Sequence, residues 1–354
     1  MTSVGELRRR TLESVSRPSY SLTRPDMVLL NDNANLYGAN PAVEYVAERF
    51  DFGRLWAYPS ENSDQLRARL ASEFNVSTDE VIVGNGSDEL LDIVTKCFIN
   101  PGDIMACPTP TFAMYKFYAS VNLADVREKL LRSDFSLDAD TLIQEPAKLT
   151  AVCQPNNPTA NLFDPREVRR LLDESRGIVL VDEAYADFCG SDMMSEVLSC
   201  ERGIDVRTFS KAFGLAGLRA GFAVARKEVV DELRRVRTPF GLNSFTEAVA
   251  MRAMEDRLWV KETVDRMVAD RGYLSERMGR LGFQVRPSVC NFVIAKVPSD
   301  SGRFVTVLRE RGVAVRDCGQ FPMMKDFIRV TVGPRPLMDR FLTEAESLLR
   351  GGVA

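Results

Sequence analysis

The stretch TFSKAFGLAGLRAGF, from Thr208 to Phe222, places one lysine among small and apolar residues, with an arginine eight positions later. A lysine that is held out of water has a lowered pKa, and its neutral amine can attack a carbonyl group. Lys211 is therefore a candidate nucleophile, and Arg219 is a candidate ligand for an anion. The alternative is a surface lysine in a flexible loop, and this stretch alone does not decide between the two.

The composition excludes several other catalytic chemistries. The chain has no histidine, which removes Ser-His-Asp and Cys-His catalysis, histidine bases and histidine–metal sites. Its seven cysteines are scattered without a C-x-x-C pair, a pattern that fits reduced thiols and gives no zinc ribbon. Acid–base chemistry must therefore use carboxylates, tyrosines, cysteines, a lysine or a cofactor.

Length and charge narrow the class of protein. With 354 residues the chain can form two domains, or one large domain with a lobe. A net charge of −4 argues against binding to nucleic acid, whose partners are usually basic. The N-terminal residues lack the apolar core of a signal peptide, and no apolar run reaches membrane-spanning length. We therefore expect a cytoplasmic protein that binds neither nucleic acid nor membrane.

Helical and strand patterns alternate from about residue 40. Residues 63–74 and 87–98 read as helices, the first with Ser63 as its N-cap, and Asp164-Pro165 opens another helix. Short apolar runs read as strands at 80–84, 149–154, 177–182, 203–210 and 220–225. Apolar strands separated by helices indicate an α/β fold, with a mostly parallel sheet sandwiched by helices.

The pattern changes near residue 243. A long helical stretch is followed by short strands and two further helices, which indicates a smaller α+β unit. We predict three parts: an N-terminal arm at 1–35 that packs on the small domain or on a partner subunit, a large domain at 36–242, and a small C-terminal domain at 243–354.

The chemistry-bearing residues follow the predicted strands of the large domain. The first strand ends in Asn85-Gly86-Ser87-Asp88, and later strands end in PNNPTA, in Asp182-Glu183-Ala184-Tyr185 and in Ser210-Lys211. Ligands of such sheets bind at the carboxyl ends of the strands, so we expect these residues to meet. Taken alone, Gly84-x-Gly86 fits a tight turn, a phosphate site at a helix start, or a nucleotide site in an oxidoreductase or a non-catalytic protein.

Taken together, these motifs resemble the pyridoxal-phosphate aminotransferases of fold type I, in the branch of the histidinol-phosphate aminotransferases. The resemblance covers nearly the whole chain. It rests on LNDNANLYG (30–38), YPS (58–60), GNGSDEL (84–90), PTFAMY (110–115), PNNPT (155–159), VDEAY (181–185), TFSKAFGLAGLRAG (208–221), VAVRDC (313–318) and IRVTVG (328–333).

The resemblance implies a cofactor, pyridoxal 5'-phosphate, that is bound covalently by Lys211. Asp182 would pair with the nitrogen of the cofactor ring, and Asn157 and Tyr185 would donate hydrogen bonds to the ring's phenolic oxygen. Phe112 would stack on the ring. A set of donors would hold the cofactor phosphate: the backbone of Ser87 and Asp88, with Thr208, Ser210 and Arg219. Lys211, freed by the substrate amine, would also move the proton at the substrate's Cα.

The resemblance also implies a homodimer with shared active sites, because Tyr58 would reach the cofactor phosphate of the neighbouring subunit. Arg329 and Arg316 would bind the substrate's anion, with Asn157 beside them and Tyr20 closing from the N-terminal arm. One arginine pair could then serve the phosphate of histidinol phosphate and the carboxylate of a 2-oxo acid such as 2-oxoglutarate.

Four positions depart from the usual pattern of the branch. Ala34 and Leu36 replace an acidic residue and a proline, and Gln154 and Ala160 stand where an asparagine and a glycine are usual. The loss of the acidic residue and the proline concerns the substrate's side-chain end, while the cofactor residues are intact. An aromatic amino-acid aminotransferase and a threonine-phosphate decarboxylase of the same fold therefore remain alternatives.

Overall fold

The computed structural model of the chain describes residues 12, 15 and 26–351. Its larger part is built on a seven-stranded sheet in the order β2-β8-β7-β6-β5-β3-β4, in which β8 alone runs in the direction opposite to the other strands. The strands are β2 (Val81–Gly84), β3 (Ile104–Thr109), β4 (Asp125–Leu130), β5 (Leu149–Cys153), β6 (Ile178–Asp182), β7 (Gly203–Thr208) and β8 (Gly221–Ala225).

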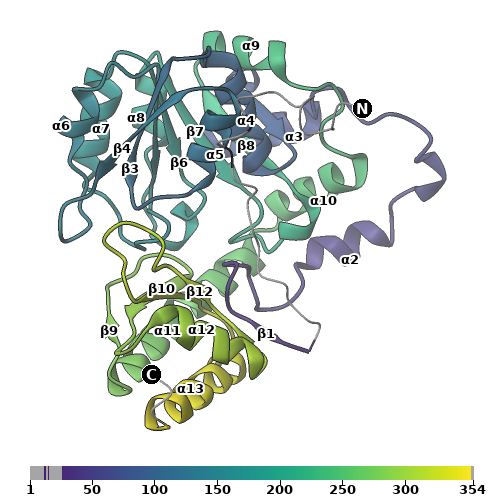
Figure 1. Cartoon of the computed structure of the whole chain (residues 1–354). Coiled ribbons are helices and arrows are strands. Elements are labelled where there is room, and N and C mark those ends of the chain that lie inside the picture. The colour runs from purple at the N-terminus through teal and green to yellow at the C-terminus, as the bar shows by residue number, and fades with distance from the viewer. Residues whose placement is uncertain (1–11, 13–14, 16–25, 352–354) are drawn as a thin grey trace, which may run out of the picture.

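Helices flank this sheet (Figure 1). They are α2 (Pro41–Ala47), α3 (Asp64–Phe74), α4 (Gly86–Phe98), α5 (Met114–Val121), α6 (Ala139–Ile143), α7 (Pro165–Glu174), α8 (Met194–Ser199), α9 (Lys227–Val236) and α10 (Ser244–Glu255), with short 3-10 turns η2 (Phe52–Arg54), η3 (Thr78–Glu80), η4 (Ala186–Phe188) and η5 (Ala216–Leu218). Every residue of β2, β5, β6 and β8 is buried, as expected for strands covered on both faces. The predicted α/β fold is thus confirmed.

The smaller part lies below the large sheet in Figure 1 and has its own hydrophobic core. Its four-stranded sheet has the order β12-β13-β10-β9, and a separate strand pair joins β1 to β11. The elements are β1 (Val28–Leu29), α11 (Leu258–Arg280), β9 (Gln284–Val285), β10 (Phe292–Lys296), α12 (Ser301–Glu310), β11 (Val313–Ala314), β12 (Arg316–Asp317), β13 (Phe327–Thr331) and α13 (Arg335–Arg350).

The N-terminal residues that the structure describes belong with the smaller part. Strand β1 pairs in parallel with β11, and Leu30 is fully buried in the small core. Helix α10, by contrast, packs on α2 and α3 of the large part. The division at residues 35 and 243 remains a proposal. Among the described residues, no helix has the length and apolar character that crossing a membrane requires.

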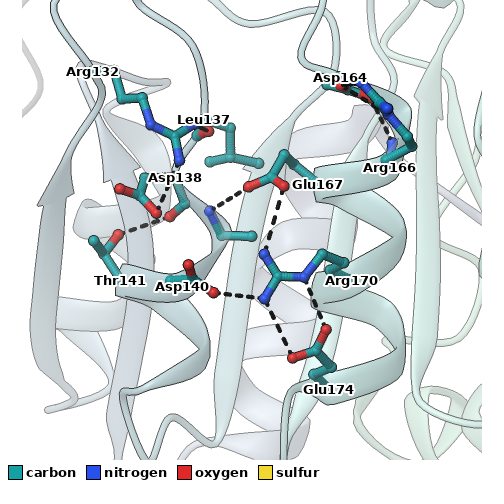
Figure 2. Close-up of polar contacts among 11 residues, drawn as sticks. Arg132, Leu137, Asp138, Asp140, Thr141, Asp164, Arg166, Glu167, Arg170 and Glu174 are labelled. Atoms are coloured by element: carbon teal, nitrogen blue, oxygen red, sulfur yellow. Dashed lines mark hydrogen bonds and ion pairs between the residues drawn. The ribbon is translucent and has the colours of Figure 1, made fainter.

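A polar network joins α6 to α7 on the surface of the large part (Figure 2). Arg170 on α7 pairs with Asp140 on α6 at 2.6 Å, and Glu167 accepts a hydrogen bond from the backbone N–H of Ala139 at 3.1 Å. The predicted cap of α7 is present, because Asp164 accepts the N–H of Arg166 at 2.9 Å. Such exposed pairs each contribute about 0.2–1 kcal/mol, so the network orients α6 more than it stabilises the fold.

One predicted helix cap is wrong. Ser63 stands at the N-cap position of α3, but its hydroxyl makes no capping hydrogen bond. The Oγ atom of Ser60 instead accepts the N–H of Asp64 at 3.2 Å. Ser63 has a φ of +53°, in the left-handed region, so its backbone lacks the extended geometry that a capping side chain needs.

Candidate active site

The carboxyl ends of β2, β5, β6 and β7 meet at one cavity of about 770 Å³. Twelve predicted site residues line it: Ser87, Asp88, Phe112, Asn157, Asp182, Tyr185, Thr208, Ser210, Lys211, Arg219, Arg316 and Arg329. Tyr58 does not line it and is 81% exposed elsewhere on the chain. Tyr20 lies outside the described residues. The geometry of a parallel sheet explains the convergence, since its strand ends share one edge.

Lys211 follows β7 in a turn whose other residues are buried. Its Nζ atom donates to the backbone oxygen of Asp32 at 3.0 Å. Burial, and after it the positive charge of Arg329, lower the pKa of Lys211 to about 8. With this pKa roughly a tenth of the amine is neutral at pH 7 and about half at pH 8, so the neutral form that a nucleophile or a base requires is accessible.

Asp182 ends β6 and is 3% exposed. It accepts hydrogen bonds from the Tyr115 hydroxyl at 2.7 Å and from the N–H of Ala184 at 3.1 Å. Burial raises the pKa of Asp182 to about 6, although both hydrogen bonds act in the opposite direction. A buried carboxylate with fixed donors is suited to hold a cationic ring nitrogen.

Tyr185 and Asn157 each have a partner on their oxygen atom. Asn33 Nδ2 donates to Tyr185 Oη at 3.0 Å, and Arg329 Nη1 donates to Asn157 Oδ1 at 2.6 Å. The hydroxyl hydrogen of Tyr185 and the amide NH₂ of Asn157 remain as donors. Both residues line the cavity, so both can donate to one acceptor oxygen within it.

A second group of donors surrounds the start of α4. Arg219 donates to Ser210 Oγ at 3.4 Å and pairs with Asp88 at 2.8 Å. Gly86 has a φ of +82°, which favours glycine, and a Cβ atom there would lie 2.7 Å from Arg219 Nη2. The helix start, one guanidinium and nearby hydroxyls together form an anion site. Glu89, in the first turn of α4, would repel an anion if it faced one, but its carboxylate accepts the N–H of Asn85.

Arg316 and Arg329 are direct partners across the antiparallel pair of β12 and β13. Arg329 Nη2 donates to the backbone oxygen of Asn31 at 2.6 Å, while its buried Nε has no hydrogen-bond partner among the described residues. No residue that the structure describes accepts a hydrogen bond from the Arg316 guanidinium. Two neighbouring cations with unused donors provide a second anion site.

The four unusual positions do not line the cavity among the described residues. Leu36 packs against Gly333, and Gln154 bonds both backbone groups of Phe163 at 2.9 and 3.0 Å. Ala160 has a φ of +64°, a conformation that costs an alanine about 1 kcal/mol and a glycine nothing. The departures therefore affect the walls behind the site and not its lining.

The sequence interpretation missed several residues of the site. Tyr115 lies within the motif PTFAMY, and Asn33 lies within LNDNANLYG, but nothing in either motif indicates the distant partner. The outer wall, also missed, is mostly apolar and aromatic: Met114, Phe117, Gln320 and Phe321. A helical stripe in 113–120 was the only available signal for this wall.

A lysine of lowered pKa, a buried acid and two anion sites at the edge of a parallel sheet define an enzyme of the pyridoxal-phosphate class. The Asp182 carboxylate can accept from the charged ring nitrogen of that cofactor, and the donors present fit its ring oxygen and its phosphate. The chain matches the family model "Aminotransferase class I and II" over residues 25–344, and it belongs to this family.

Relatives and solved structures agree with this assignment. The histidinol-phosphate aminotransferase of Thermoanaerobacter sp. (strain X514) is 35% identical over 87% of this chain and 88% of its own length. That of Methanocaldococcus jannaschii is 30% identical over 96% and 94%. The crystal structure of histidinol-phosphate aminotransferase from Sinorhizobium meliloti, in complex with pyridoxal-5'-phosphate, superposes with a TM-score of 0.89 at 20% identity, over 97% of this chain and 98% of that one. The predicted enzyme class and the resemblance to this branch are confirmed.

Proposed function

We propose that this aminotransferase transfers the amino group of histidinol phosphate to 2-oxoglutarate, which gives imidazole acetol phosphate and glutamate. The names of relatives at 30–35% identity support this donor. The observation that carries it is the arginine pair Arg316 and Arg329, which faces the same cavity as Lys211.

The chain's own residues divide the work around pyridoxal phosphate. When bound, the cofactor supplies an electron sink for the negative charge that develops at the substrate's Cα. Lys211 would hold the cofactor aldehyde, and Asp182 would keep the ring nitrogen charged. Tyr185 and Asn157 would donate to the ring oxygen, and Phe112 would stack on the ring. The phosphate would be held by the backbone N–H groups of Ser87 and Asp88 and by the side chains of Thr208, Ser210 and Arg219.

Lys211 is also the base. With the cofactor bound and the substrate amine in place, its Nζ atom would be free to take up and hold the proton from the substrate's Cα. A pKa of about 8 places the neutral amine close to the working pH, where general bases are most effective. With no histidine in the chain, no other lining residue suits this task better.

One anion site serves both half-reactions in this proposal. The phosphate ester of histidinol phosphate and a carboxylate of 2-oxoglutarate are both recognised by planar guanidinium groups. Arg329 is fixed by Asn157 and Asn31, whereas Arg316 has no such anchor among the described residues. We infer that Arg316 adjusts to the different sizes of the two anions.

We further propose a cytoplasmic homodimer. Large apolar side chains gather in the segment between α2 and α3, which loops out at the side of the molecule (Figure 1). Trp56 is 82% exposed, and Tyr58 stacks on Phe240 at 4.9 Å. Exposed aromatic surface of this kind favours a protein interface. In the dimer, Tyr58 reaches the partner's cofactor phosphate, and Tyr20 closes on the substrate.

An aromatic amino-acid donor is the second candidate, because Phe117 and Phe321 line the outer wall. Steady-state assays with 2-oxoglutarate and each of histidinol phosphate, phenylalanine, tyrosine and threonine phosphate separate the possibilities. We expect kcat/KM for histidinol phosphate to exceed the others by about tenfold or more. Faster turnover of an aromatic amino acid, or carbon dioxide release from threonine phosphate, contradicts the proposed donor.

A further inference from the structure

Asn33 connects the small part of the molecule to the tyrosine of the cofactor site. Its backbone N–H donates to Thr331 Oγ1 at 3.0 Å, and its backbone oxygen accepts from Asn291 Nδ2 at 3.0 Å. Its side chain uses both ends, since Oδ1 accepts from Thr331 Oγ1 at 3.3 Å and Nδ2 donates to Tyr185 Oη at 3.0 Å. Asn33 is 1% exposed, so these contacts are shielded from water.

The bond to Thr331 fixes which way the Asn33 amide faces. The Thr331 hydroxyl accepts the N–H of Asn33 and therefore directs its own hydrogen to Oδ1. The NH₂ group must then face Tyr185. Since the tyrosine oxygen already accepts this bond, the phenol hydrogen is left to point elsewhere, and none of the described residues accepts it.

The available direction is the cavity. Tyr185 is buried and lines the cavity, with its ring held edge-on to Phe292 at 5.3 Å. Phe292 is the cross-strand partner of Thr331, so the same strand pair fixes both the ring and the amide. A phenol held in this way can only donate to an acceptor in the cavity.

We propose that Asn33 is a positioning residue that holds Tyr185 as a hydrogen-bond donor to the ring oxygen of the cofactor. This inference rests on the proposed cofactor site and adds a residue to it. Arg329, two residues before Thr331 on β13, donates to Asn157 Oδ1 and so orients the Asn157 amide in the way that Asn33 orients Tyr185. Strand β13 therefore orients both donors to the ring oxygen.

Loss of this orientation should shift the protonation equilibrium of the lysine–cofactor linkage in the holoenzyme. A donor to the ring oxygen stabilises its negative charge, which disfavours the protonated form of the lysine–cofactor linkage. If Asn33 no longer orients Tyr185, the protonated form persists to higher pH. Visible absorption distinguishes the two forms, so the midpoint of a spectral pH titration reports this step without any measurement of turnover.

The test uses holoenzyme carrying Asn33→Gly, because glycine adopts the φ of +56° at this position without strain. We expect the spectral midpoint to rise by roughly half to one pH unit. In a Tyr185→Phe background the same substitution should give no further shift. Asn35→Ala is the matched control, since Asn35 lies in the same loop and bonds Ala212 but not Tyr185. Its midpoint should stay at the wild-type value.

A second variant, Asn33→Asp, provides the test if Asn33→Gly folds poorly. Asn33→Asp keeps the shape of the side chain, but a carboxylate oxygen replaces the NH₂ group and accepts the hydroxyl hydrogen of Tyr185. The spectral midpoint should therefore rise further when this substitution is made in the wild type than when it is made in Tyr185→Phe. An unchanged midpoint, or equal shifts in both backgrounds, overturns the inference. A wild-type protein that titrates normally but does not use histidinol phosphate refutes only the proposed donor. A wild-type protein without a visible band refutes the cofactor site, and this inference with it.

Discussion

The hydroxyl group of Tyr115 donates a 2.7 Å hydrogen bond to Asp182 Oδ2, although the two residues are 67 positions apart. Tyr115 is buried on α5, and its ring packs edge-on against Phe112 at 5.5 Å. The carboxylate that we propose for the ring nitrogen is thus anchored by the segment that supplies the proposed stacking aromatic, Phe112. Tyr115 acts through Asp182 and is a positioning residue.

Tyr115→Phe should therefore weaken catalysis without displacing the cofactor. Loss of the hydrogen bond raises the pKa of Asp182 above about 6, so the shared proton moves from the ring nitrogen toward the carboxylate. We expect kcat to fall roughly tenfold and the acid limb of its pH profile to move upward. Tyr273→Phe is the control, because it removes a similar hydrogen bond to Asp339 on the surface. It should leave both kcat and the acid limb of the pH profile unchanged. A wild-type profile in Tyr115→Phe contradicts this role.

The lowered pKa of Lys211 predicts how cofactor attachment depends on pH. Only the neutral amine attacks the aldehyde, so the second-order rate for apoprotein and pyridoxal phosphate should rise as pH increases through about 8 and then level off. Arg329→Gln removes a positive charge that lowers the pKa of Lys211. The midpoint of the rate profile of this variant should therefore lie at higher pH. The titration of free pyridoxal phosphate is the same in the wild-type and the Arg329→Gln experiments, so it cannot cause a difference between their midpoints. Coincident rate profiles, measured by stopped-flow absorbance, contradict the electrostatic role of Arg329.

The shared anion site predicts a paired loss. Arg329→Ala should lower kcat/KM for both half-reactions by about a hundredfold, because an anion loses a bidentate partner. Arg316→Ala should also affect both half-reactions, and it breaks no side-chain hydrogen bond among the described residues. Arg286→Ala, on the small part but outside the cavity lining, is the control. Single-turnover measurements with glutamate separate the half-reactions, and unchanged glutamate kinetics in Arg329→Ala contradict a common site.

The dimer proposal predicts complementation between inactive variants. Mixed subunits of Tyr58→Ala and Lys211→Ala contain one intact site for each hybrid dimer, so roughly a quarter of wild-type activity should return. Lys211→Ala mixed with Asp182→Ala should recover nothing, since both residues serve the site of their own chain. Absence of recovery despite demonstrated subunit exchange contradicts a shared site.

Much of the site follows from the sequence, because its residues lie at strand ends that a parallel sheet must bring together. Lys211, Asp182 and Asn157 could be placed in this way. Asn33 and Tyr185 could not be paired, because their contact depends on how β13 packs beside the large sheet. Strands β3 and β4 were also missed, and the exposed and charged DVREKL of β4 lacks the apolar run that marked the predicted strands.

The central claim is that Lys211 holds pyridoxal phosphate. The most direct measurement is reduction of the holoenzyme with borohydride, followed by peptide mass mapping. The account predicts one reduced cofactor for each chain, on the peptide that contains Lys211, and none in Lys211→Ala. A label on another lysine, or an unlabelled protein after saturation with the cofactor, contradicts it.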